Sequence, residues 1–142
     1  MTVAAVIERD ARFLMVEEHA DGRRVYNQPA GHLEPDEGLV DAVVREVLEE
    51  TRTHFRPRGV IGIYRWVHPA SGETHVRIAF SGTTEGTEPG RALDTPIIAP
   101  RWCSYDELRA APDALRSPLV LGCIDDYLGG RHYPLALLRE LA

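Results

Sequence analysis

The chain has 142 residues, of which 44% are hydrophobic and 27% charged, which allows one ordinary globular domain and excludes a disordered chain. Its formal net charge of -6 argues against a protein that holds long stretches of nucleic acid, because backbone phosphates require a basic surface. Both features are compatible with a small phosphorylated substrate that is held through a divalent cation.

The first part of the chain predicts strands followed by one long helix. In chain order the predicted elements are a strand at 2–8, a turn at 9–12, a strand at 13–18, an extended segment at 26–30, a loop at 31–38 and a helix from Leu39 to Thr51. The extended segment follows from Pro29, which keeps the residue before it out of the helical region.

The second part predicts three strands, a loop and two helices. In chain order these are strands at 60–68 and 74–81 around a turn at 69–72, a mobile loop at 83–95, a strand at 97–102, a short helix opened by Ser104 and a helix over 117–128. Strands and helices that alternate without regular β-α-β spacing indicate an α/β fold in which helices cover both faces of a mixed sheet.

The helix from Leu39 to Thr51 carries a cluster of acidic residues beside its apolar face. At 100° per residue, one stripe contains Val40, Val43, Val44, Val47 and Leu48. Glu46, Glu49 and Glu50 follow at i, i+3 and i+4 on an adjacent arc, where each pair of like charges costs about 0.2–0.5 kcal/mol. One interpretation is a solvated acidic face with salt bridges, and the other is a face that binds a divalent cation. Arg45 is the only basic neighbour on the N-terminal side and cannot neutralise three carboxylates.

The segment from Gly31 to Thr51 resembles the Nudix box, G-x5-E-x7-R-E-U-x-E-E-x-G-U, in which U is a bulky aliphatic residue. The matching positions are Gly31, Glu37, Arg45, Glu46, Val47, Glu49 and Glu50. Arg52 and Thr53 depart from the pattern, at its last glycine and last aliphatic position. Arg52 either adopts the left-handed conformation, at a cost of about 1 kcal/mol, or lets the helix continue.

The resemblance implies a Nudix-type α/β/α sandwich as a single domain over residues 1–142, with a metal site on the helix. It implies that Mg²⁺, with Mn²⁺ as an alternative, is bound by Glu46, Glu49, Glu50 and the backbone carbonyl of Gly31. Arg45 would orient the carboxylates and Glu37 would pair with Arg45, since a guanidinium can hold two carboxylates in place.

Segments outside the box extend the resemblance to a bacterial Nudix subfamily. These are VYNQPAGHLEPDEGLVDA before and across the box, RSPLV at 116–120 and RHYPL at 131–135. The subfamily implies hydrolysis of small nucleoside di- and triphosphates or of hydroxymethylpyrimidine pyrophosphate, with release of phosphate or pyrophosphate. The alternatives are a pyrophosphohydrolase acting on RNA 5′ ends or dinucleotides, and a non-catalytic nucleotide-binding regulatory module.

The general base has two candidate sources, because a carboxylate must accept the proton of the attacking water. One is Glu49 itself. The other is the loop at 83–95, which offers Asp94, Glu88 and Glu85.

Candidate substrate contacts are less specific. They are Tyr26 and Trp66 for stacking on a ring, His32 and Arg77 for phosphate, and Arg116, Arg131 and His132 for further contacts. Each has a structural alternative, namely core packing for the aromatic residues, a loop hydrogen bond for His32, an exposed strand position for Arg77 and helix-end packing for the last three.

The remaining features concern the environment of the protein. No apolar run approaches the roughly 20 residues of a membrane helix, and the N-terminus reads as a first strand rather than a signal peptide, so we expect a cytoplasmic location and no membrane partner. Cys103 and Cys123 support neither a disulfide framework nor a thiolate zinc site, and two reduced, buried thiols are expected. The expected oligomeric state is a monomer or a homodimer.

Overall fold

A computed structural model describes residues 1–141 and contains two four-stranded sheets. The first has the strand order β5–β1–β7–β6. Its members are β5 (Ala30–His32), β1 (Thr2–Val6), β7 (Thr74–Thr87) and β6 (Thr53–Val67). β1 runs parallel to β7, whereas the β1–β5 and β6–β7 pairs are antiparallel. The predicted mixed sheet is therefore confirmed.

The second sheet is antiparallel and was not predicted as a separate unit. It consists of β2 (Glu8–Arg9), β3 (Arg12–Ala20), β4 (Arg23–Asn27) and β8 (Ile97–Ser104). β3 lies at its centre: β8 pairs along one edge of β3, while β2 and β4 pair with successive parts of its other edge. The predicted turn at 9–12 is present, with Asp10 and Ala11 at positive φ.

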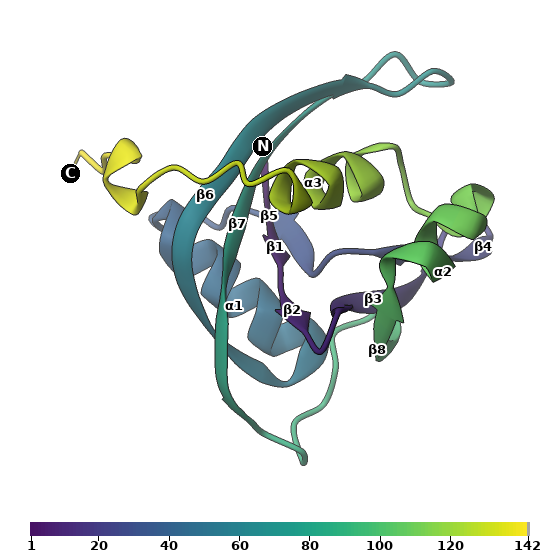
Figure 1. Cartoon of the computed structure of the whole chain (residues 1–142), viewed down its shortest axis with the longest axis horizontal. Helices are drawn as coiled ribbons and strands as arrows, with labels where there is room; N and C mark the ends of the chain where they lie inside the picture. Colours follow the sequence, from purple (N-terminus) through teal and green to yellow (C-terminus); the bar gives the residue numbers. More distant parts are fainter. Residues whose placement is uncertain (142) are drawn as a thin grey trace.

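The helices lie on opposite faces of the first sheet, as Figure 1 shows for α1 (Leu39–Thr51) and α3 (Leu119–Leu128). Strand periodicity produces this arrangement, because successive side chains of β1 point to opposite faces. Val3 and Ala5 pack in the apolar cluster that contains Val47 of α1, and Val6 packs with α3. The predicted helical layers on both faces are confirmed.

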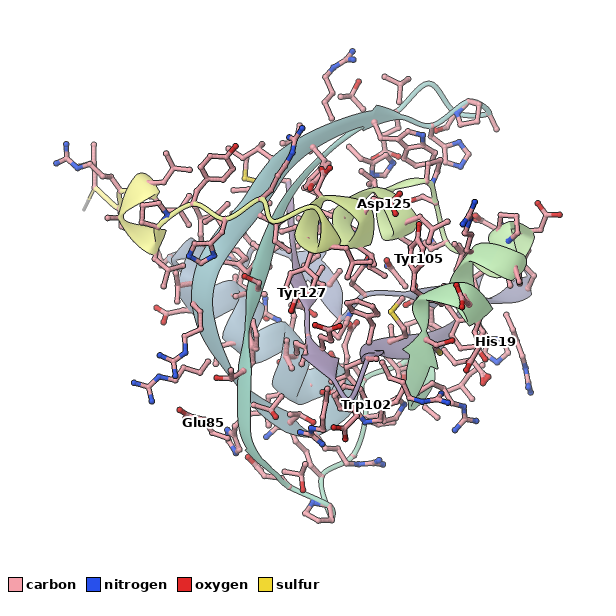
Figure 2. The ribbon with its side chains drawn as sticks, in the orientation of Figure 1. His19, Glu85, Trp102, Tyr105, Asp125 and Tyr127 are labelled. Atoms are coloured by element: carbon pink, nitrogen blue, oxygen red, sulfur yellow. The ribbon has the colours of Figure 1, made fainter. Side chains whose placement is uncertain are left out.

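The smaller helical elements lie beside the second sheet and at the C-terminal end. They are α2 (Tyr105–Ala110) and the 3₁₀ turns η1 (Pro112–Ala114) and η2 (Leu135–Leu137). Ser104 caps α2 by accepting the N–H of Glu107 at 3.1 Å, as the capping pattern predicted. Tyr105 then donates to Asp125 at 2.5 Å and joins α2 to α3 (Figure 2).

The β6–β7 hairpin is longer than the sequence predicted. β6 begins at Thr53 rather than Val60, and β7 ends at Thr87 rather than Ser81. The first half of the predicted loop at 83–95 is therefore strand, and that prediction is wrong. The hairpin bends around α1 (Figure 1), and its pairing has register shifts, one of them between Pro57 and Gly59. Proline at such an irregularity is tolerated, although within a sequence it argues against a strand.

Each end of α1 is closed by a specific hydrogen bond. Arg52 has φ 60° and donates its N–H to the carbonyl of Leu48 at 2.9 Å, so the left-handed conformation is kept without glycine. At the other end, Glu140 accepts the N–H of Leu39 at 2.8 Å. A carboxylate suits that end because it compensates the helix dipole.

The RHYPL segment at 131–135 packs against β6. Tyr133 pairs with Val60, and a Cβ on Gly59 would stand 2.1 Å from Cε1 of His132, so Gly59 leaves room for the His132 ring. Packing thus accounts for His132, and Arg131 lies 3.6 Å from Asp126 of α3.

Two further expectations concern the described residues. Cys103 and Cys123 are both buried and free, as predicted. Within residues 1–141, no helix is both long enough and apolar enough to cross a membrane.

Candidate metal and active site

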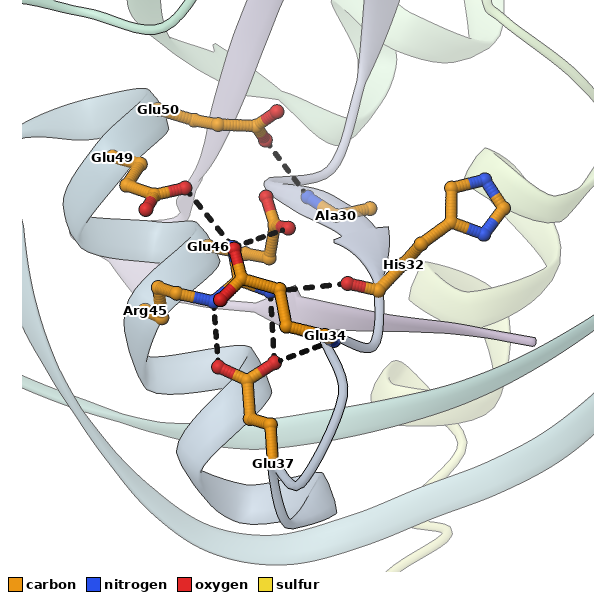
Figure 3. A network of polar contacts seen from close by, with 8 residues as sticks. All are labelled: Ala30, His32, Glu34, Glu37, Arg45, Glu46, Glu49 and Glu50. Carbon is orange, nitrogen blue, oxygen red and sulfur yellow. Dashed lines mark hydrogen bonds and ion pairs between the residues drawn. The ribbon is translucent and has the colours of Figure 1, made fainter.

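Arg45 is the centre of a polar network on the C-terminal half of α1 (Figure 3). Its Nε and Nη2 donate to the two carboxylate oxygens of Glu37 at 2.6 and 2.9 Å. Its Nη1 donates to Glu46 at 2.9 Å and to Glu49 at 3.0 Å. Nη2 also donates to the carbonyl of His32 at 3.0 Å. A single planar cation therefore fixes three carboxylates and the loop that precedes the helix.

Glu50 projects toward β5 and is not bound by Arg45. Its Oε1 accepts the N–H of Ala30 at 2.9 Å, and the residue is only 9% exposed. Glu46, which is 8% exposed, also approaches β5, because a Cβ on Gly31 would meet its carboxylate atoms at 2.2–2.5 Å. Gly31 is therefore required for close approach rather than for a special backbone angle.

Burial raises the pKa of all three glutamates of α1. Desolvation raises the pKa of Glu46 to about 7 against the attraction of Arg45, and it raises the pKa of Glu50 to about 9. For Glu49, desolvation and then the Asp94 carboxyl raise the pKa. Fully ionised, the cluster would carry more negative charge than Arg45 compensates, and a bound cation would relieve that condition.

The raised pKa values predict how stability depends on pH in the metal-free protein. Glu46 and Glu50 hold protons in the folded state that the unfolded chain releases above about pH 4.5. Their contribution is therefore fully present below that pH and is lost as the pH rises through about 7 and about 9. We expect thermal unfolding in EDTA to show a midpoint that falls over this range. Glu50→Gln should flatten the fall, and an unchanged slope in that variant would contradict this interpretation.

A methyl group at position 31 tests the close approach of β5 to the cluster. In Gly31→Ala the new Cβ displaces the Glu46 carboxylate, which is the flexible end of a side chain, so the fold should be kept. Because the displaced group is a proposed ligand, we expect metal affinity to fall about 10–100-fold in a Mg²⁺ or Mn²⁺ titration. The matched control is Gly90→Ala, where a Cβ meets nothing within 4 Å. Equal metal affinity in both variants would argue against this role for Gly31.

The donor set fits a hard divalent cation in its chemistry. Mg²⁺ and Mn²⁺ prefer oxygen ligands, and Figure 3 shows the carboxylates of Glu46, Glu49 and Glu50 near one another on α1. Within residues 1–141, no three acidic, histidine or cysteine side chains already converge as a metal cage. Binding would therefore turn carboxylates from their present partners toward the ion.

Of the three loop candidates for the general base, only Asp94 reaches the cluster. Its backbone N–H donates to the carbonyl of Glu49 at 3.1 Å, and its carboxyl raises the pKa of Glu49. Glu88 instead lies 2.7 Å from His54, and Glu85 lies 2.8 Å from Arg56 at the periphery of the molecule (Figure 2). The structure thus brings Asp94, from the loop at 83–95, next to Glu49, the other predicted source of the general base.

A cavity of about 700 Å³ opens on the α3 side of β5, a size suited to a small ligand. It shares Ala30 and Gly31 with the glutamate cluster, and it is also lined by the predicted contacts His32, Trp66, Arg77 and Arg116. Tyr26 is not among the residues that line it and packs against the apolar cluster of α3.

Sequence reasoning missed several polar residues of this region. They are Glu34, 3.5 Å from Arg45; Glu18, buried and paired with Arg116 at 2.8 Å; Asn27 and Gln28, which hold Arg77; and His68 and His75, which line the cavity. The sequence signal for Asn27 and Gln28 was two amides directly before Pro29 in a predicted extended segment, where buried amides require partners.

Comparison with known proteins agrees with this geometry. A family model described as the NUDIX domain matches residues 1–120. The chain is 40% identical over 140 residues to the phosphatase NudJ of Escherichia coli strain K12, an alignment that covers 99% of this chain and 90% of that relative.

Solved structures give the same result. A NUDIX hydrolase from Nitrosomonas europaea is 48% identical and superposes with a TM-score of 0.96, covering 99% of this chain and 95% of that one. A MutT NUDIX hydrolase from Burkholderia pseudomallei, at 22% identity and a TM-score of 0.73, shares the fold over 88% of this chain and 95% of that one.

Proposed function

This chain belongs to the Nudix hydrolase family, and from that premise we propose that it hydrolyses a phosphoric anhydride in a small nucleoside di- or triphosphate or a pyrimidine pyrophosphate, with Mg²⁺ as its metal. Membership makes the chain a hydrolase of the phosphatase and pyrophosphatase type, whereas the metal and the substrate are our proposals. The observation that carries them is the cluster held by Arg45, which shares the β5 backbone with a cavity large enough for such a substrate.

Glu46, Glu49, Glu50 and the carbonyl of Gly31 would hold the cation, which when bound lowers the pKa of a coordinated water and neutralises charge on the anhydride oxygens. Arg45 contributes by fixing the carboxylates of Glu46 and Glu49 through Nη1. Its own orientation is set by the two hydrogen bonds to Glu37. Positioning of this kind removes rotamer freedom before the substrate arrives.

We assign the general base to the Glu49 and Asp94 pair. Water attacks phosphorus, the anhydride P–O bond breaks, and one carboxylate of the pair accepts the proton of the water. Desolvation and the proximity of Asp94 both raise the pKa of Glu49, and a carboxylate with a raised pKa is a stronger proton acceptor.

A substrate panel tests the proposal. Nucleoside mono-, di- and triphosphates, a pyrimidine pyrophosphate, a dinucleoside polyphosphate and a 5′-triphosphorylated oligonucleotide are incubated with Mg²⁺ or Mn²⁺, and orthophosphate and pyrophosphate are scored separately. We expect turnover of free di- or triphosphates to exceed that of the oligonucleotide, in keeping with the net charge of -6. Faster turnover of the oligonucleotide or dinucleotide would overturn the choice of substrate, and no turnover with any compound would favour a non-catalytic module.

A further inference from the structure

Arg77 is a buried cation whose contacts carry no opposite charge. The residue is 5% exposed, yet it lines the cavity beside the glutamate cluster. Nη1 donates to Oε1 of Gln28 at 2.8 Å, and Nη2 donates to Oδ1 of Asn27 at 3.2 Å. Its Nε has no hydrogen-bond partner among residues 1–141. The Cys123 thiol of α3 also lies against Arg77, but burial raises the pKa of this thiol and keeps it neutral. Two amides and a thiol therefore orient the guanidinium without compensating its charge.

The carboxylates of the cavity do not fill this role. Glu18 lies near Arg77 but is paired with Arg116 at 2.8 Å, and Asp21 and Glu73 are exposed to solvent. Buried charges in proteins are normally paired, because an uncompensated one is costly. An anion that binds in the cavity and pairs with the guanidinium would compensate this charge, which explains why an unpaired arginine is buried here.

The far end of the same cavity is aromatic. The ring centroids of His68 and His75 lie 5.2 and 5.4 Å from that of Trp66. Nδ1 of His68 accepts the N–H groups of Ala70 and Ser71 at 3.1 and 3.3 Å, which fixes this ring on the hairpin turn. Half-buried aromatic rings at a cavity wall suit a flat ring in the ligand.

Strand register orders these parts in a line. His32 pairs with Thr2, Thr2 pairs with Arg77, and Trp66 on the next strand pairs with His75. Neighbouring strands lie about 4.8 Å apart, and β7 is two strands from β5, so Arg77 lies ~10 Å from β5. It therefore lies between β5, which the glutamates of α1 approach, and the aromatic end of the cavity.

We propose that this cavity binds the part of the substrate that is not hydrolysed, with a flat heteroaromatic ring against Trp66 and His75 and a phosphate group on Arg77. The inference rests on the proposed function and assigns the residues that would recognise the ring and the non-hydrolysed phosphate of its substrate. It selects ring-bearing phosphoric anhydrides over sugar diphosphates and inorganic polyphosphate. The ring end and the phosphate subsite are both distinct from the carboxylates that would hold the metal.

Binding to metal-free protein tests the proposal without relying on activity. Cytidine 5′-monophosphate, cytidine and ribose 5-phosphate are titrated in EDTA, and the indole N–H signals of Trp66 and Trp102 are followed by NMR. Trp102 serves as an internal control, because it packs against the apolar core beside α1, with Arg9 over its ring, and does not line the cavity. We expect the nucleotide to shift the Trp66 signal, with both fragments requiring at least about 10-fold higher concentrations.

Two variants separate the ring from the phosphate. Arg77→Met should weaken nucleotide binding about 10–100-fold and leave cytidine binding unchanged, with an unfolding midpoint no lower than that of the wild type. Trp66→Leu should weaken nucleotide binding about 10-fold and leave ribose 5-phosphate binding unchanged. Val67→Ala, on the same hairpin and exposed, is the matched control. If Arg77→Met fails to fold, Trp66→Leu decides the question.

Equal affinity for the nucleotide and ribose 5-phosphate, or unchanged nucleotide affinity in folded Arg77→Met or in Trp66→Leu, would overturn the inference. Its failure can be distinguished from that of the proposed function. Metal-dependent hydrolysis without nucleotide binding in the cavity removes only the inference. Nucleotide binding as described without hydrolysis of any anhydride removes the proposed function.

Discussion

Glu50→Gln is expected to lower kcat/KM with Mg²⁺ by roughly 10³-fold while the protein stays folded. The residue is 9% exposed, and the one hydrogen bond of its carboxylate in the network is with the N–H of Ala30. Glutamine is nearly isosteric and its carbonyl oxygen can keep that bond, so the change removes charge rather than shape. Steady-state kinetics over a range of Mg²⁺ concentrations measures the loss, and excess metal should not restore the rate.

The same substitution should stabilise the metal-free protein. Because desolvation raises the pKa of Glu50 to about 9, ionising it in the folded state is costly near neutral pH. We expect a gain of roughly 1–3 kcal/mol in the free energy of unfolding near pH 8 in EDTA. The matched control is Asp41→Asn, an exposed acid on the same helix that should change neither activity nor stability appreciably. Activity retained in Glu50→Gln would contradict the assignment of this residue as a ligand.

Arg45→Lys is expected to lower metal affinity and kcat/KM about 10–100-fold despite the retained charge. Lysine has a single ammonium group and cannot reproduce the two parallel hydrogen bonds to Glu37 together with those to Glu46 and Glu49. The carboxylates would then lose their fixed orientation, and higher Mg²⁺ concentrations should recover part of the rate. Calorimetric metal titration and kinetics measure the two effects separately.

The control for Arg45→Lys is Arg109→Lys on α2, where the side chain is exposed. That variant should behave as the wild type. If Arg45→Lys also retained wild-type metal affinity and rate, Arg45 would be an ion-pair partner without a positioning role. Loss of folding is not expected, because the α1 core stripe is unaffected by the change.

The acidic site was predictable because its residues are local in sequence. The helical period placed the three glutamates on one arc, and the loop spacing from Gly31 to Arg45 brought Glu37 to the guanidinium. The close approach of β5 is also written in the sequence, since Gly31 has no Cβ to collide with Glu46. The sequence does not decide between a left-handed Arg52 and a longer helix, and the structure shows the left-handed conformation.

The extended hairpin was not predictable from its outer ends. Along the first part of β6 only Phe55 is an apolar residue that points inward, and Pro57 argues against a strand. The end of β7 alternates Gly, Thr and Glu, which resembles a loop when its pairing partner is unknown. Pairing across the sheet, and not local preference, forms these segments.

The cavity depends on contacts between distant segments and was only partly foreseen. Trp66 and Arg77 were candidates, but an exposed strand position was an equal alternative for Arg77. The structure instead buries it against Asn27 and Gln28, about 50 residues away in the chain. No periodicity within one element carries such information.

The most direct test of the central claim is Mn²⁺ binding measured by electron paramagnetic resonance in the wild type and in Glu50→Gln. If the glutamates of α1 form the metal site, the free Mn²⁺ signal will be suppressed by wild-type protein, and the suppression will be largely lost in the folded variant. Mg²⁺ should compete for the same site. Equal Mn²⁺ binding by the two proteins would contradict the assignment of the metal to α1.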